Sequence, residues 1–95
     1  MTTIVNKRTH TPTPNDVYIG RGGIWGNPFI IGKDGTREEV IEKYRELMHR
    51  NLNSISGEAW VSKILALDGK NLVCFCKPQA CHGDVLVEII EELMG

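Results

Sequence analysis

One segment of this chain restricts the fold more than any other: residues 71–76, NLVCFC, are apolar almost throughout. A strand of this kind is expected at the centre of a sheet that is covered on both faces, and such strands are typical of parallel sheets. A short loop, KPQA, follows it, and an apolar stripe at helical spacing then begins near CHGD. This order predicts a central strand that leads through a sharp turn into a helix.

The remaining elements are expected on both sides of a glycine-rich loop. Short runs of strand-forming residues occur at 3–5 and 16–20. The stretch TREE forms a capping box, in which the Thr36 hydroxyl accepts the Glu39 N–H and the Glu39 side chain reaches back, so a helix is predicted to begin there. A second helix is expected within residues 58–67.

The whole chain, residues 1–95, is expected to form a single α/β domain, with a partly parallel sheet of about three to four strands and about three helices. Its residues are 41% hydrophobic and 24% charged, as in ordinary globular proteins. The net charge of −1 gives no support to binding of nucleic acid, which usually requires a basic excess. No apolar run approaches the ~20 residues of a membrane span and no signal peptide is evident, so a cytoplasmic location and no membrane partner are expected.

All three cysteines lie in the stretch 71–84, followed at once by a histidine. Cys74, Cys76, Cys81 and His82 are ligand types of a structural zinc site, although zinc ligands are usually spaced more widely than Cys-x-Cys. The cysteines could instead serve only as small buried hydrophobic residues. This second interpretation fits Cys74 best, because it lies within the predicted strand.

We prefer a third interpretation, a site that acts on or binds a small molecule. Ligands of parallel α/β sheets bind beyond the carboxyl ends of the strands, beside helix N-termini. The candidate catalytic residues at that place are Cys76, Cys81, His82 and Asp84. A helix N-terminus favours a thiolate, so Cys76 or Cys81 could act as the nucleophile with His82 as the base. Asp84 would orient His82, and the same helix terminus could instead hold a phosphate.

The loop GRGGIWGNPF, residues 20–29, is the second unusual stretch. Its candidate ligand-binding residues are Gly20, Arg21, Gly22, Trp25, Gly26 and Asn27. Glycines let the backbone approach a ligand, the arginine fork suits a phosphate, and the indole can stack on a base. The loop matches neither a Walker loop nor a G-x-G-x-x-G fingerprint. The alternative is a tight structural turn with Trp25 and Phe29 in the core, and for Phe29 this alternative is preferred.

The combination of VYIGRGGIWGNPF with NLVCFCKPQACHGDVL resembles domain-of-unknown-function family 4326, a family of short bacterial and phage proteins. The similarity extends from about Val5 to about Leu93, and the G-N-P-F and C-x-C-x4-C-H pieces are specific in combination. The resemblance implies that the glycine loop and the cysteine–histidine turn belong to one shared pattern. It implies no particular reaction.

These observations predict a nucleotide-like small molecule as the partner, bound where the glycine loop meets the cysteine–histidine turn. If the molecule is a nucleoside, chemistry at its N-glycosidic bond is suggested only by analogy with other small α/β nucleotide binders. One alternative is a zinc-stabilised interaction module without catalysis. Another, given the resemblance to phage proteins, is a phage-borne inhibitor of a host protein. No cofactor is expected, although zinc is possible, and the sequence determines neither the oligomeric state nor the reaction.

Overall fold

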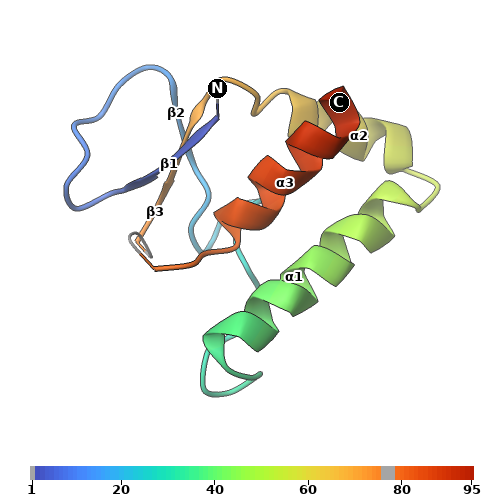
Figure 1. Cartoon of the computed structure of the whole chain (residues 1–95), viewed down its shortest axis with the longest axis horizontal. Coiled ribbons are helices and arrows are strands. Elements are labelled where there is room, and N and C mark those ends of the chain that lie inside the picture. The colour runs from blue at the N-terminus through green and yellow to red at the C-terminus, as the bar shows by residue number, and fades with distance from the viewer. Residues whose placement is uncertain (1, 76–78) are drawn as a thin grey trace.

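The computed structural model describes residues 2–75 and 79–95, and Figure 1 shows the arrangement of their elements. The strands in this part of the chain are β1 (Thr3–Asn6), β2 (Asp16–Tyr18) and β3 (Asn71–Cys74). The helices are α1 (Arg37–Leu52), α2 (Gly57–Leu65) and α3 (Gly83–Met94). This content confirms the predicted α/β class.

The three described strands form one sheet in the order β1-β3-β2, and both outer strands run parallel to β3. Leu72 faces Ile4 on one side and Val17 on the other, and its side chain is fully buried. The apolar run is therefore the central strand, as predicted. Because β2 is an edge strand, its last residue, Tyr18, is 43% exposed, so β2 is less buried than its sequence suggested, although Ile19, the next residue, is fully buried.

The central strand is shorter than its apolar run. It ends at Cys74, and Phe75 lies in a bend that leaves the sheet. The predicted strand continued through Cys76, which lies outside the described residues. The predictions that concern Cys76 therefore stay predictions.

Helix α1 begins where the capping box predicted. The Glu39 N–H donates to Thr36 Oγ1 at 3.2 Å, and the Thr36 N–H donates to Glu39 Oε1 at 2.9 Å. The helix buries one stripe, formed by Val40, Tyr44 and Met48. Successive members of this stripe are four positions apart, so they lie on one face of the helix, and that face packs against the core.

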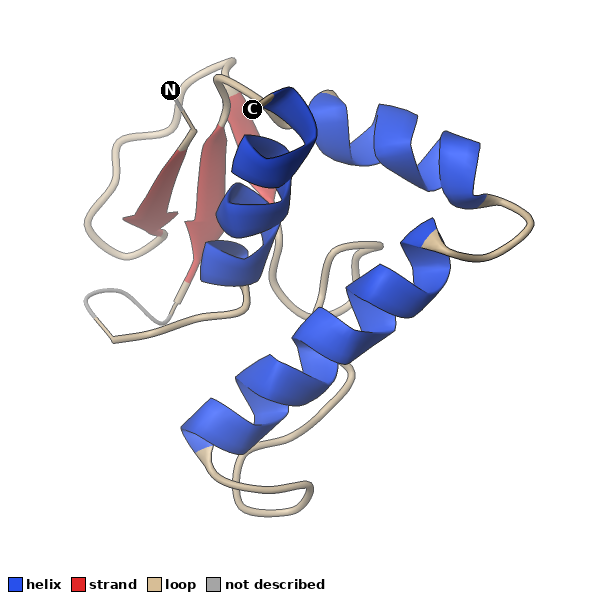
Figure 2. Ribbon diagram, turned by 45° about the vertical axis from the view of Figure 1, so that its right-hand side comes forward, coloured by secondary structure: helices blue, strands red, loops and turns tan. Residues whose placement is uncertain are grey.

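The sheet lies at one side of the molecule and the helices lie together at the other (Figure 2). Helix α3 contacts β1, and it also contacts both α1 and α2. Its apolar stripe, which joins the hydrophobic core between the sheet and the other helices, consists of Val85, Leu86, Ile89 and Ile90. Arg45 of α1 pairs with Glu88 of α3, with N–O distances of 2.9 and 3.1 Å. Among the described residues, no helix is both long enough and apolar enough to cross a membrane.

Parallel strands bring three loops to one edge of the sheet. After β1 the chain continues into Lys7, whose N–H donates to the Cys74 carbonyl at 2.8 Å. After β2 it continues into Ile19, whose N–H donates to the Val73 carbonyl at 3.0 Å. The chain leaves β3 at Phe75. All three segments therefore lie at the carboxyl edge, where ligands of parallel α/β sheets usually bind.

The start of α3 has no room for a side chain larger than that of glycine. A Cβ atom on Gly83 would lie 2.8 Å from Cδ1 of Ile19 and 3.2 Å from Cδ1 of Ile4. We predict that Gly83→Ala lowers the free energy of unfolding by about 1–2 kcal/mol, because the core must shift to accept a methyl group. Urea denaturation would measure this loss.

The matched control is Gly23→Ala, in the glycine loop. There the new Cβ would have no neighbour closer than 3.8 Å, so its effect is expected to stay within about 0.5 kcal/mol. A Gly83→Ala protein as stable as the wild type would contradict the close packing of α3 on the sheet.

Candidate functional site

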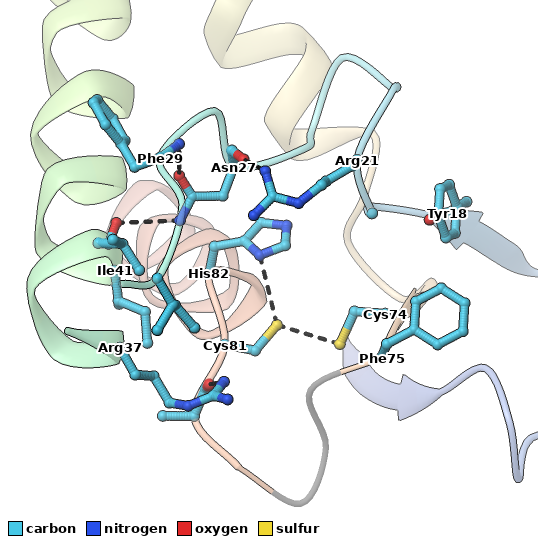
Figure 3. Close-up of a pocket in the computed structure, with 14 residues that line it drawn as sticks. Tyr18, Arg21, Asn27, Phe29, Arg37, Ile41, Cys74, Phe75, Cys81 and His82 are labelled. Atoms are coloured by element: carbon cyan, nitrogen blue, oxygen red, sulfur yellow. Dashed lines mark hydrogen bonds between the residues drawn. The ribbon is translucent and has the colours of Figure 1, made fainter. Parts of the chain in front are cut away.

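A pocket of about 310 Å³ opens at the carboxyl edge of the sheet (Figure 3). It lies between the ends of β2 and β3, the glycine loop, the first turns of α1 and the start of α3. The lining residues are Tyr18, Gly20, Arg21, Asn27, Phe29, Ile31, Arg37, Val40, Ile41, Cys74, Phe75, Ala80, Cys81 and His82. The pocket therefore brings the glycine loop and the cysteine–histidine turn together, although they are far apart in the sequence.

His82 connects these two segments. Its Nε2 lies 2.6 Å from the carbonyl oxygen of Ile19, just before the glycine loop. Because a carbonyl oxygen only accepts, Nε2 must carry the hydrogen. In the neutral ring Nδ1 then has a free lone pair, and it faces Sγ of Cys81 at 3.8 Å. The protein thus selects the tautomer that can accept a proton from Cys81.

Burial keeps this imidazole neutral. His82 is only 8% exposed, and the loss of solvation holds the pKa of its ring below 6.5. The positive charge of Arg21 lowers this pKa further. The carbonyls of Ile19 and Trp25 and the charge of Asp84 oppose the shift without cancelling it. The ring also packs edge-on against Tyr44, with centroids 4.9 Å apart.

Cys81 lies two residues before Gly83, the first residue of α3. The Gly83 N–H donates to its Sγ at 3.2 Å, and its Sγ lies 3.2 Å from Sγ of Cys74. Both thiols are buried, yet both border the pocket. An N–H donor and a neutral imidazole nitrogen beside one sulfur are the groups that a nucleophilic thiol needs. This arrangement distinguishes Cys81 from Cys74, which the sequence could place only in a strand.

Asp84 has a different contact from the one predicted. Its Oδ2 accepts the Cys81 N–H at 3.1 Å, while the Ile19 carbonyl holds the histidine ring. The expectation that Asp84 orients His82 through a hydrogen bond is therefore corrected. Asp84 instead fixes the backbone of Cys81 at the start of the helix.

The glycines of the loop serve mainly to pack the loop against itself. A Cβ atom on Gly26 would lie 2.7 Å from the carbonyl oxygen of Gly20, and one on Gly20 would collide with the Tyr18 ring. Gly22 has a φ of 90°, is exposed and does not line the pocket. Of the predicted ligand-binding glycines, Gly20 alone borders the pocket.

Two polar residues of the loop do border the pocket. The Arg21 guanidinium donates to the Asn27 carbonyl oxygen at 3.2 Å, which closes the loop. The Asn27 side chain donates to the Val40 carbonyl at 3.1 Å and accepts the Phe29 N–H at 3.0 Å. Asn27 thus ties the loop to α1. Within the described part of the chain, the Arg21 guanidinium donates only to the Asn27 carbonyl, so most of its N–H groups are available to a ligand.

The two aromatic rings of the loop exchange their expected roles. Trp25 is buried in the core, packs edge-on against Trp60 with centroids 6.0 Å apart, and does not line the pocket. Its carbonyl accepts the Tyr44 hydroxyl at 2.8 Å, and burial raises the pKa of that hydroxyl. Phe29, expected in the core, is half-buried and forms a wall of the pocket. Hydrophobicity alone could not separate these roles, because both rings come from one irregular loop.

The sequence analysis did not predict several of the lining residues, among them Tyr18, Arg37 and Phe75. Arg37 is the first residue of α1, and its guanidinium donates to the Ala80 carbonyl at 3.0 Å. Nothing local distinguishes it from other helical arginines. Tyr18 ends β2 and Phe75 directly follows β3, so the parallel topology was the signal that could have placed them here.

Within residues 2–75 and 79–95, no three His, Cys, Asp or Glu side chains gather closely enough to hold a metal ion. One of the four candidate zinc ligands, Cys76, lies outside those ranges. Cys74, Cys81 and His82 alone do not form a metal site.

The architecture and the site define a small α/β domain with a pocket at the carboxyl edge of a parallel sheet. The chain belongs to the family described as Domain of unknown function (DUF4326), whose model matches residues 4–92. It is similar to the "Uncharacterized 12.4 kDa protein in nrdA-td intergenic region" of Enterobacteria phage T4, with 42% identity over 79 residues. That alignment covers 82% of this chain and 69% of the phage protein. No solved structure matches. The family resemblance seen in the sequence is thus confirmed.

The buried neutral His82 predicts a stability that depends on pH. Its pKa is lower in the folded protein than the value of about 6.5 expected after unfolding, so the unfolded chain binds more protons as pH falls through this range. The contribution of His82 is fully present above pH 6.5 and is lost at lower pH. We expect His82→Gln to reduce the loss of unfolding free energy between pH 7.5 and 5.5, as measured in urea.

Nitrogen NMR of the ring provides a direct check. It should show Nε2 protonated at neutral pH and a titration midpoint below 6.5. A midpoint at or above 6.5, or an unchanged pH dependence in the variant, would contradict this account of His82.

Proposed function

We propose that this protein binds a nucleotide-like small molecule in the pocket at the carboxyl edge of its sheet. The observation that carries the proposal is the charge of the lining: it includes Arg21 and Arg37, and its described residues include no Asp or Glu. Two carboxylates that are close in sequence to lining residues bond to the chain itself, Glu39 to Thr36 and Asp84 to the Cys81 N–H. Among the described residues neither guanidinium group forms an ion pair with a carboxylate, and two such groups suit a phosphate.

The walls and size of the pocket support the same ligand class. Phe29, Tyr18 and Phe75 offer aromatic surface on which a base can stack, and Ile31 and Ile41 add apolar area. Its volume of about 310 Å³ is at the lower end of the range for ligand pockets, about 300–1,000 Å³, and suits a mononucleotide better than a larger cofactor. A cytoplasmic location belongs to the proposal, because free nucleotides and reduced thiols are found there.

The phosphate is assigned to the arginines rather than to the helix N-terminus. At the start of α3 the N–H of Gly83 points at Sγ of Cys81, and those of Asp84 and Val85 donate to the carbonyls of Cys81 and His82. These donors are already used, so an anion would have to displace bonds within the turn. In this proposal Arg21 and Arg37 hold the phosphate from two sides.

The binding test is calorimetric titration with nucleoside 5′-monophosphates and with the matching nucleosides. We expect the phosphate to increase affinity, and Arg21→Ala or Arg37→Ala to weaken monophosphate binding by about tenfold or more, since a hydrogen bond to a charged group contributes about 1.5–3 kcal/mol. Nucleoside binding should change little.

Arg50→Ala is the control for that experiment. Arg50 is exposed in the last turn of α1, about 20 Å along the helix from Arg37, so its removal should leave both affinities unchanged. If no mononucleotide binds, or if all three arginine variants bind as the wild type does, the proposed function is wrong.

A second candidate, chemistry on the bound molecule, is favoured by the Cys81–His82 geometry. We propose hydrolysis of the N-glycosidic bond of a bound nucleoside. Cys81 gives its proton to Nδ1 of His82, its sulfur bonds to the sugar carbon, and the base departs with that proton. Water then gives its hydroxyl to the sugar and returns a proton to the thiol.

Chromatography of free base tests this candidate after incubation with ribo- and deoxyribonucleoside monophosphates. We expect base release by the wild type, and none by Cys81→Ser or His82→Gln under the same conditions. Cys81→Ser should still bind the monophosphate, because the two arginines are intact. Binding without base release from any of these substrates would exclude the hydrolysis and leave the binding function standing.

A further inference from the structure

Two exposed aromatic rings next to the pocket are each covered by a cation. The Lys7 ammonium lies 5.6 Å from the centroid of the Tyr18 ring, and the Arg8 guanidinium carbon lies 5.6 Å from that of Phe75. The two rings pack edge-to-face with centroids 6.4 Å apart, and Phe75 is 46% exposed. We call these four residues the aromatic–cationic strip.

The parallel topology assembles the strip from segments far apart in the sequence. Lys7 and Arg8 follow β1, Tyr18 ends β2, and Phe75 follows β3. Within the described parts of the chain, neither Lys7 nor Arg8 forms an ion pair, so both charges are available to a ligand. Half-exposed aromatic rings beside such cations are the elements that stack bases and hold phosphates.

The strip is continuous with the pocket. Tyr18 and Phe75 belong to both, and in Figure 3 they lie on the opposite side of the pocket from Phe29 and Arg37. A molecule that fills the pocket would therefore have the strip beside it. The net charge of −1 conceals this local positive charge. Carboxylates elsewhere, such as Glu91 and Glu92 at the other end of α3, balance the cations of the strip.

We propose that the ligand is a nucleotide within a single-stranded nucleic acid, with one base in the pocket and a neighbouring nucleotide on the strip. This inference rests on the proposed function and names its substrate class. The exposed ring of Phe75 stacks the neighbouring base, the edge-to-face contact with Tyr18 supports that ring, and Lys7 and Arg8 contact the phosphates on the two sides of the base. The strand is single because a base enters the pocket only when it is unpaired.

Fluorescence anisotropy with labelled thymidine and uridine hexanucleotides tests the inference, with the corresponding monophosphates as unlabelled competitors. We expect the hexanucleotides to bind at least about tenfold tighter than the monophosphates, because several bases and phosphates add contacts. Lys7→Gln with Arg8→Gln should abolish that gain and reduce the salt dependence by roughly 0.7 in log–log slope for each cation removed. Phe75→Leu should weaken hexanucleotide binding by about fivefold or more.

Lys63→Gln is the matched control. It also removes a cation from over an aromatic ring, since the Lys63 ammonium lies 5.0 Å from the Trp60 centroid, but this pair is on α2 and outside the strip. It should change neither affinity.

The outcomes separate the inference from the function on which it rests. Monophosphate binding without tighter hexanucleotide binding would overturn the inference alone, as would hexanucleotide binding that the Lys7 and Arg8 variants leave unchanged. Duplexes that bind as tightly as single strands would also overturn it. Loss of monophosphate binding in the wild type would instead overturn the proposed function.

Discussion

The parallel pairing of both outer strands with β3 is the constraint on which the site depends. It sends Lys7, Ile19 and Phe75 out of the sheet at the same edge. In an antiparallel arrangement, one of these segments would leave at the opposite edge, and the pocket would lose a wall. The burial of Leu72, Val73 and Cys74 supports this pairing, since an apolar central strand cannot be moved to an edge without exposing its side chains.

A single buried hydrogen bond connects the two unusual stretches of the sequence. His82 at the start of α3 donates to the carbonyl of Ile19, immediately before the glycine loop. The bond fixes the ring tautomer and holds the start of α3 against the glycine loop, so that Arg21 and Cys81 line the same pocket. The position of the proposed phosphate-binding group relative to the thiol is therefore set by the fold and not by the ligand.

The sequence was most informative where the determining interaction is local. The capping box at Thr36 uses contacts between residues three apart in the chain, and the apolar run of β3 is a pattern within consecutive residues. The predictions of a helix start and of a central strand were both confirmed. Arg37, by contrast, reaches the pocket through the packing of α1, which no short motif encodes. Trp25 and Phe29 could not be assigned for the same reason: tertiary packing decides which ring of one loop enters the core.

The order of the strands also determines when the sheet can form during synthesis. Thr3 and Asp16 both pair with Asn71, and β1 and β2 have no pairing with each other. The first two strands must therefore wait, unpaired, until the ribosome has released the third. Pairings over such long sequence separations carry a large loop-closure entropy, which slows folding. Both the sheet and the pocket require β3, so a nascent chain that lacks β3 has neither.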